Sequence, residues 1–219
     1  MPQCAGAYAA HRGGMVRPDA PEKSMLQHLT RTALTLALAA CLPAQAHIQI
    51  YGAELSGLAE SPPVNSTGSG MVRVTLDDHD FTMRVEVSFA DLVGTVTASH
   101  IHCCTAAAGS GTAGVATPVP SFPGFPSGVS AGSYDQTFDL TQGASWNVAF
   151  INANGGTTGT AFSALATGLA DGRAYLNIHT SFVGSGEIRG FLAPVPEPGS
   201  LALMAAGLAL VGSLARRRP

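Results

Sequence analysis

The sequence predicts an all-β fold, an antiparallel sandwich or barrel of about seven short strands, flanked at each terminus by an apolar targeting helix. Residues 81–89 alternate strictly between apolar and polar side chains, and a period of two is typical of a strand with one buried face. The chain contains 26 Gly and 14 Pro, many of them clustered with Ser and Thr between the apolar segments. Only residues 162–169 favour a turn or two of helix. Short strands separated by such clusters are typical of sandwiches and barrels.

The other elements follow from the same patterns. Residues 71–76 also alternate, and the turn-forming Asp77-Asp78-His79-Asp80 joins them to residues 81–89, so a hairpin is expected. The remaining predicted strands are residues 48–55, 95–102, 146–151, 174–179 and 187–192. Residues 103–134 are too rich in Gly, Pro, Ala and Ser for regular strands, and one long surface loop is expected there. Loops longer than about 12–15 residues inside a compact domain are usually functional or mobile.

The distribution of charge excludes a nucleic-acid-binding protein. The chain is only 11% charged, with a formal net charge of -3. Residues 47–195 contain four arginines, no lysine and eleven acidic residues, so they lack the basic stripe that neutralises phosphates. An acidic body of this kind attracts cations or basic partners.

Residues 1–46 are predicted to be an N-terminal extension and a signal peptide. From Met25 the chain carries one cation, an apolar stretch over residues 33–42 and then Ala44-Gln45-Ala46, which fits an A-x-A cleavage site. We expect translation to start at Met25 rather than Met1. Signal peptidase would then leave a mature chain that begins at His47.

Residues 195–219 carry a second targeting segment. The motif Pro196-Glu197-Pro198 precedes the apolar residues 201–214 and the basic cluster Arg216, Arg217 and Arg218. The arginines favour the cytoplasmic side of a membrane, which places the body outside. As a helix, residues 201–214 span about 21 Å, short of the ~30 Å hydrocarbon core, so transient retention is favoured over a permanent anchor. An ordinary single-span anchor is the alternative.

This terminus resembles the PEP-CTERM sorting signal of Gram-negative bacteria, with all three parts in order. The resemblance implies recognition by an exosortase, removal of the tail at the inner membrane, and release to the cell surface or an exopolysaccharide matrix.

Three histidines are candidate metal ligands. His100 and His102 point to one face of the strand predicted over residues 95–102, and His179 lies on the strand predicted over residues 174–179. If these strands are neighbours, three neutral imidazoles converge, which suits copper or zinc, with Cys103 as a fourth ligand. The alternative is that the histidines hydrogen-bond to backbone groups and hold the long loop on the sheet.

Cys103 and Cys104 are the cysteines that remain after the predicted signal peptide is removed. Export through an oxidising compartment favours a disulfide, and within one chain they can pair only with each other. An intermolecular bridge and thiolates on a metal are the alternatives.

Glu187 and Arg189 share one face of the last predicted strand, and we expect a partly buried structural ion pair between them. No nucleophile or second carboxylate is placed beside Glu187 by the sequence pattern. The motifs G-x-S-x-G, H-E-x-x-H and the P-loop are also missing from the sequence. We therefore expect no enzymatic activity.

The body resembles the CHRD domain, the module first named from chordin and also found in secreted bacterial proteins. The matching segments are residues 53–57, the His100-Ile101-His102 motif, residues 172–180 and residues 186–190, in that order. The resemblance covers most of residues 47–194 and implies an all-β extracellular module with no established enzymatic activity.

Together these features predict an exported, non-enzymatic binding or structural module of the cell surface or exopolysaccharide matrix. Its expected partners are signal peptidase and an exosortase during export, then extracellular polysaccharide or surface proteins. The alternative is a metal-binding protein or an enzyme like copper/zinc superoxide dismutase that uses the histidine cluster. A dismutase would need further metal-binding histidines in a loop, and residues 103–134 contain no His.

Overall fold

A computed structural model of the chain describes residues 48–196 and 205–208. The predicted signal peptide, Glu197, Pro198 and the cluster Arg216, Arg217 and Arg218 lie outside these residues, as does most of the apolar segment 201–214. Within the described part of the chain, no helix has both the length and the apolar character needed to cross a membrane.

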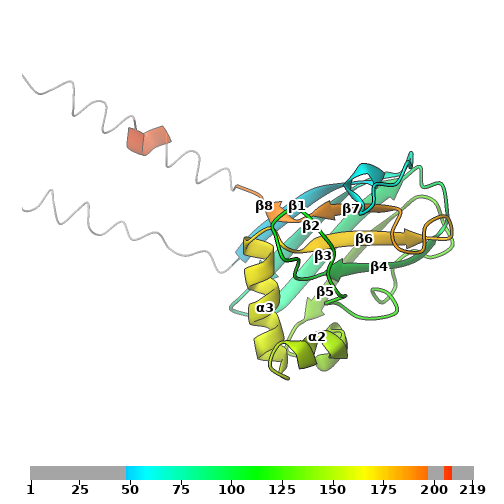
Figure 1. Cartoon of the computed structure of the whole chain (residues 1–219). Coiled ribbons are helices and arrows are strands. Elements are labelled where there is room, and N and C mark those ends of the chain that lie inside the picture. Colours follow the sequence, from blue (N-terminus) through cyan, green and yellow to red (C-terminus); the bar gives the residue numbers. More distant parts are fainter. Residues whose placement is uncertain (1–47, 197–204, 209–219) are drawn as a thin grey trace, which may run out of the picture. The chain divides into compact units, whose positions relative to one another are not determined.

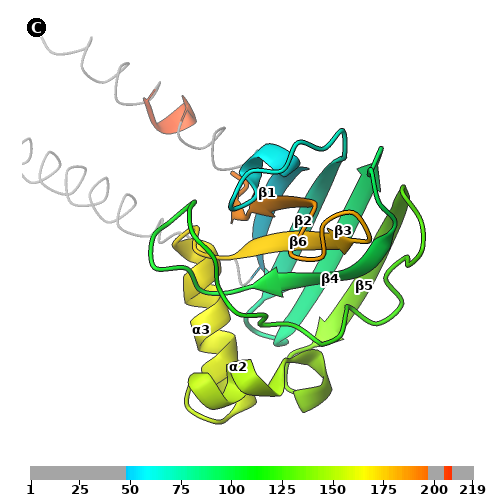
Figure 2. The ribbon, with the colours of Figure 1, turned by 45° about the vertical axis from the view of Figure 1, so that its right-hand side comes forward.

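One antiparallel sheet forms the body, and it curls into a half-barrel (Figures 1 and 2). The strand order is β4-β6-β7-β1-β2-β3-β5, with β8 paired to β1. The strands are β1 (Ile48–Ser56), β2 (Ser69–Asp77), β3 (Thr82–Ala90), β4 (Val96–His102), β5 (Gly132–Asp139), β6 (Tyr175–Thr180), β7 (Ile188–Phe191) and β8 (Ala193–Pro194). The prediction of antiparallel β structure is confirmed. Of the two predicted architectures, sandwich or barrel, the structure is closer to the barrel, because all eight strands are hydrogen-bonded into a single curled sheet.

The hydrophobic core lies on one face of this sheet. Alternate residues of β2 and β3, such as Val74 and Val85, are fully buried there, as their period of two requires. Ile101 of β4 and Leu176 and Ile178 of β6 continue the same face. The residues between them, including His100, His102 and His179, therefore point to the opposite face.

Two helices lie near one end of the sheet, one where a strand was predicted and one where a short helix was predicted. Residues 146–151 were predicted as a strand but belong largely to α2 (Val148–Ala153), because the side chain of Asn147 caps that helix by accepting from the amide of Ala149. The second helix, α3 (Thr158–Ala170), contains the predicted turn of helix and begins with a capping box between Thr157 and Thr160. Both helices lie at one end of the sheet (Figure 1).

The segment 103–134 is partly strand and otherwise fastened to the sheet. Residues 132–134, predicted to be loop, form the start of β5, a strand that the sequence pattern did not predict. Farther upstream, the amides of Ala116, Phe122 and Gly128 donate to carbonyls of β4 at 2.9 to 3.0 Å. Phe122 is 2% exposed. The loop therefore covers the edge of β4 and one side of the core.

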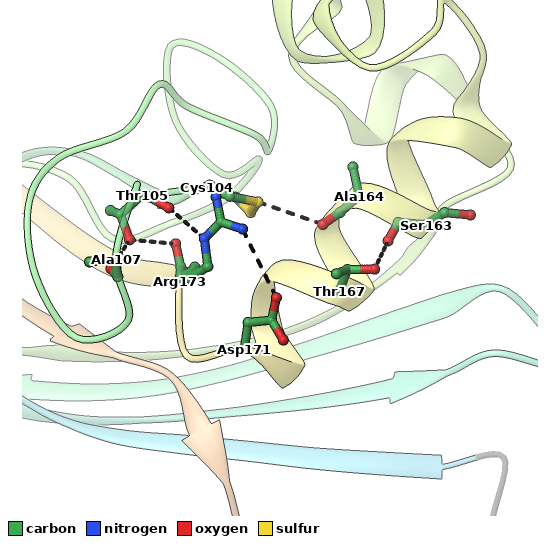
Figure 3. Close-up of polar contacts among 9 residues, drawn as sticks. Cys104, Thr105, Ala107, Ser163, Ala164, Thr167, Asp171 and Arg173 are labelled. Atoms are coloured by element: carbon green, nitrogen blue, oxygen red, sulfur yellow. Dashed lines mark hydrogen bonds and ion pairs between the residues drawn. A yellow bond between two sulfur atoms is a disulfide. The ribbon is translucent and has the colours of Figure 1, made fainter.

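Cys103 and Cys104 are joined by a disulfide that packs against α3. A Cβ at Gly168 would overlap both sulfur atoms, so the absence of a side chain there lets the helix approach. The sulfur of Cys104 also lies 3.6 Å from the carbonyl oxygen of Ala164 (Figure 3). Next to it, Arg173 donates to the carbonyl of Thr105. These contacts fix the chain directly after His102.

Candidate metal centre

The three histidines converge on the face of the sheet opposite the core. Strands β4 and β6 are neighbours, and their register places Ala98 opposite His179 and His100 opposite Asn177. One ligand atom from each of His100, His102 and His179 lies within 4.8 Å of the others. Among the residues that the structure describes, these three form the group of His, Cys, Asp or Glu side chains close enough to share an ion.

Each imidazole is held by one backbone carbonyl of a loop. His100 Nε2 lies 2.7 Å from the carbonyl of Pro120, His102 Nδ1 lies 3.0 Å from that of Ala113, and His179 Nδ1 lies 3.0 Å from that of Gly184. A carbonyl oxygen only accepts, so the ring nitrogen that faces it carries the proton. The tautomer of each neutral ring is thereby fixed, as is usual for metal-binding histidines.

The other nitrogen of each ring has a free lone pair. His100 Nδ1, His102 Nε2 and His179 Nε2 are buried and have no hydrogen-bond partner. Burial lowers the pKa of all three imidazoles, and it lowers the pKa of His102 to about 4. Three neighbouring neutral imidazoles, each with an unshared lone pair on a buried nitrogen, therefore remain at neutral pH.

This arrangement fits a transition metal ion. Bonds of 2.0–2.1 Å would bring the three nitrogens to about 3.3–3.6 Å apart, so the rings need to move inward by roughly 1 Å. Cys103 does not join them, because its sulfur is bonded to Cys104. The candidate ligand set is therefore three nitrogens, without the thiolate that the sequence suggested.

The ring of His102 belongs to a stack with the ring of Tyr175 and the guanidinium of Arg189. Its ring lies parallel to that of Tyr175, with centroids 4.8 Å apart. The guanidinium of Arg189 lies 4.8 Å from the centroid of the same Tyr175 ring. The Tyr175 hydroxyl accepts from the amide of Ala113, whose carbonyl binds His102. The stack and the loop therefore fix this ligand together.

The predicted ion pair between Glu187 and Arg189 is not formed. Arg189 lies 3.7 Å from the carboxylate of Glu60, and both residues are buried. Glu187, fully buried, instead accepts from the hydroxyls of Ser66 and Thr180 and from the amides of Val93 and Gly94. Burial raises the pKa of Glu187, but these four hydrogen bonds outweigh it, and the pKa lies below its usual value. The sequence placed Glu187 in the strand, whereas β7 begins one residue later.

Glu60 titrates close to neutral pH. Burial raises its pKa from 4.5 to about 7, against the opposing effects of Arg189, the Ser61 amide and the Asn177 side chain. A raised carboxyl pKa means that folding favours the protonated form. The resulting stability is fully present below about pH 4.5 and is lost as the pH rises through 7.

We therefore expect Glu60→Gln, which cannot ionise, to remove this pH dependence. Relative to the variant, the wild-type chain should lose about 3 kcal/mol of unfolding free energy between pH 4.5 and pH 8. Urea unfolding at several pH values measures the difference. Glu54→Gln, on the exposed side of β1, is the matched control and should follow the wild type. Parallel profiles for wild type and E60Q would contradict the prediction.

Comparison with known protein families agrees with both resemblances. The CHRD domain model matches residues 51–192, and the PEP-CTERM protein-sorting motif matches residues 194–218. No curated protein and no solved structure shows a significant match. The sorting motif indicates an exported protein that transits the membrane, and such motifs are processed by an exosortase.

Proposed function

Because the chain belongs to the CHRD domain family and ends in a PEP-CTERM sorting motif, we propose that its body is a non-enzymatic module that binds copper or zinc at the cell surface or in an exopolysaccharide matrix. The observation that carries the metal site is the set of three buried, unpartnered imidazole nitrogens of His100, His102 and His179. Exopolysaccharide or a surface protein of a Gram-negative cell is the proposed environment of the mature protein.

The chemistry of the ligands favours copper or zinc over other ions. Imidazole nitrogens suit these metals, whereas calcium and magnesium prefer oxygen ligands. The carbonyls of Pro120, Ala113 and Gly184 hold the three rings in the tautomers that metal binding needs. If the histidines served only to hold the loops, the one ring nitrogen that bonds to a backbone carbonyl would be sufficient. The second, unpartnered nitrogen of each ring would then have no role.

Absence of enzymatic activity is part of the proposal. A copper/zinc dismutase would need a second group of ligands, and among residues 48–196 and 205–208 only one group of three potential ligands is close enough to bind an ion. The acidic, lysine-free body also supports a role in attracting cations from solution.

Metal titration of the purified chain tests this function. Wild type is expected to bind one zinc or copper ion, and His179→Ala to weaken binding by at least about 100-fold, because one of three ligands is lost. His79→Ala is the matched control, since this exposed histidine lies in the turn between β2 and β3. Equal affinity in wild type and H179A would overturn the metal site.

The same proteins test the rest of the proposal. Metal-loaded wild type should not turn over superoxide, and turnover that H179A abolishes would establish the enzyme instead. A deletion strain is complemented with wild type, H179A or H79A, and the amount of each protein retained in the matrix is measured. This comparison shows whether the ion contributes to the surface role. Loss of retention is expected for H179A alone.

A further inference from the structure

The three imidazole nitrogens are not the only buried polar atoms without a partner. In the described part of the chain two further side-chain atoms share this property, Asn177 Oδ1 and Glu60 Oε1. Asn177 lies directly opposite His100 in the ladder between β4 and β6, and two residues before His179 on the same face of β6. All the unpartnered buried side-chain atoms of the described residues thus belong to one neighbourhood.

A row of buried polar groups crosses three strands at this level. His100 of β4 faces Asn177 of β6, which in turn faces Arg189 of β7. Arg189 holds the carboxylate of Glu60. All four residues are at least 93% buried, with exposed fractions of 6% for His100, 3% for Asn177, 3% for Arg189 and 7% for Glu60.

The amide nitrogen of Asn177 already has hydrogen-bond partners. It lies 3.4 Å from the carbonyl of Ser185, and the side chain also hydrogen-bonds to the carboxyl group of Glu60. A Cβ at Gly186 would overlap both amide atoms, so this glycine makes room for the side chain of Asn177. The amide is therefore held in one orientation, and its oxygen remains as an unused acceptor.

None of these unpartnered acceptors receives a hydrogen bond, because the guanidinium of Arg189, the donor opposite Asn177, is directed to the carbonyls of Ala59 and Gly111. A bare metal ion would satisfy the three nitrogens but leave the oxygen of Asn177 without a hydrogen bond, at a cost of about 1–3 kcal/mol for a buried group. A water molecule bound to the ion would satisfy it, because such a water donates its O–H group while its oxygen binds the metal. Zinc sites with three protein ligands commonly keep a water in the fourth position.

We infer that the ion keeps an exchangeable fourth ligand, a water molecule whose proton is accepted by Asn177 Oδ1 and which small anions can displace. This inference rests on the metal site proposed above. His179 is the least buried of the three ligands, so exchange with solvent takes place on its side. Asn177 is then a positioning residue, which acts on the water and does not bind the metal.

Cobalt(II) and azide are the probes that test the fourth position. Cobalt replaces zinc in such sites and gives a visible spectrum that depends on its ligands. The spectrum of the cobalt-loaded full chain should change saturably on titration with azide. Azide accepts hydrogen bonds and cannot donate one to Asn177 Oδ1, so it competes with a water that this oxygen holds.

Two substitutions at Asn177 should shift the azide affinity in opposite directions. Asn177→Leu removes the acceptor, weakens the bound water and should tighten azide binding about tenfold, the equivalent of one hydrogen bond. Asn177→Asp keeps the shape, adds a negative charge and should weaken azide binding by at least as much. If N177L does not fold, N177D carries the test alone. A purely structural role of Asn177 would not give these opposite shifts.

The possible failures are distinguishable. Absence of cobalt binding to wild type would overturn the metal site and this inference with it. A normal cobalt spectrum that azide leaves unchanged would overturn only the exchangeable ligand. Equal azide affinity in wild type, N177L and N177D would overturn the assignment of Asn177.

Discussion

Replacing Glu187 with alanine should destabilise the domain by about 3–5 kcal/mol. Its carboxylate is 0% exposed and accepts from Ser66 Oγ at 2.6 Å, Val93 N at 2.6 Å, Gly94 N at 3.0 Å and Thr180 Oγ1 at 2.6 Å. These donors come from the loop after β1, the connection between β3 and β4, and the end of β6. Alanine would leave all four without an acceptor and release three segments from one another.

Urea unfolding of wild type and E187A at neutral pH measures this effect. Glu54→Ala is the matched control, because Glu54 is exposed, and its effect should stay within about 0.5 kcal/mol. Glu187→Gln should fall between the two, since the amide keeps one oxygen but turns its NH₂ group toward the amide of either Val93 or Gly94, which donate to different oxygens of the carboxylate. An E187A loss no larger than that of E54A would show that the carboxylate does not join these segments.

Zinc should stabilise the folded chain strongly, and His102→Ala should abolish the effect. A ligand that binds only the folded state adds about 4 kcal/mol at a concentration 1,000 times its dissociation constant. For a domain of this size the midpoint of thermal unfolding should therefore rise on the order of 10 °C. His102 is the most informative position, because Tyr175 and Ala113 hold its ring on two sides.

Differential scanning calorimetry with and without zinc, and again after chelation, gives this shift directly. The comparison within each protein removes the effect of the substitution on packing, which would otherwise lower the stability of H102A. His79→Ala should keep the wild-type shift. A zinc-induced rise of the same size in H102A would mean that the ion binds elsewhere.

Strict alternation in the sequence predicted β2 and β3. The pattern of short segments between Gly, Pro, Ser and Thr clusters predicted β1, β4, β6 and β7 to within a few residues. It missed β5, where Gln136 stands between the buried Tyr134 and Phe138, so the alternation is interrupted on an edge strand. It misassigned α2, where a single cap at Asn147 decided between helix and strand.

The candidate site was predictable only where local spacing controls it. The H-x-H spacing places His100 and His102 on one face, and the addition of His179 required only that β4 and β6 be neighbours. Asn177 and Glu60 were not predicted as site residues, because their proximity depends on the β6–β7 pairing and on the path of the chain after β1. The partner of Arg189 was wrong for the same reason: Glu187 is near in sequence, whereas Glu60 is near in space.

The disulfide between Cys103 and Cys104 determines how the mature domain can associate with its neighbours. Residues 48–196 contain no other cysteine, so this part of the chain presents no free thiol for covalent cross-links between molecules. In an oxidising environment, where free thiols readily form such links, this part of the chain has none to contribute. Contacts that residues 48–196 make with other molecules are therefore non-covalent and include no intermolecular disulfide.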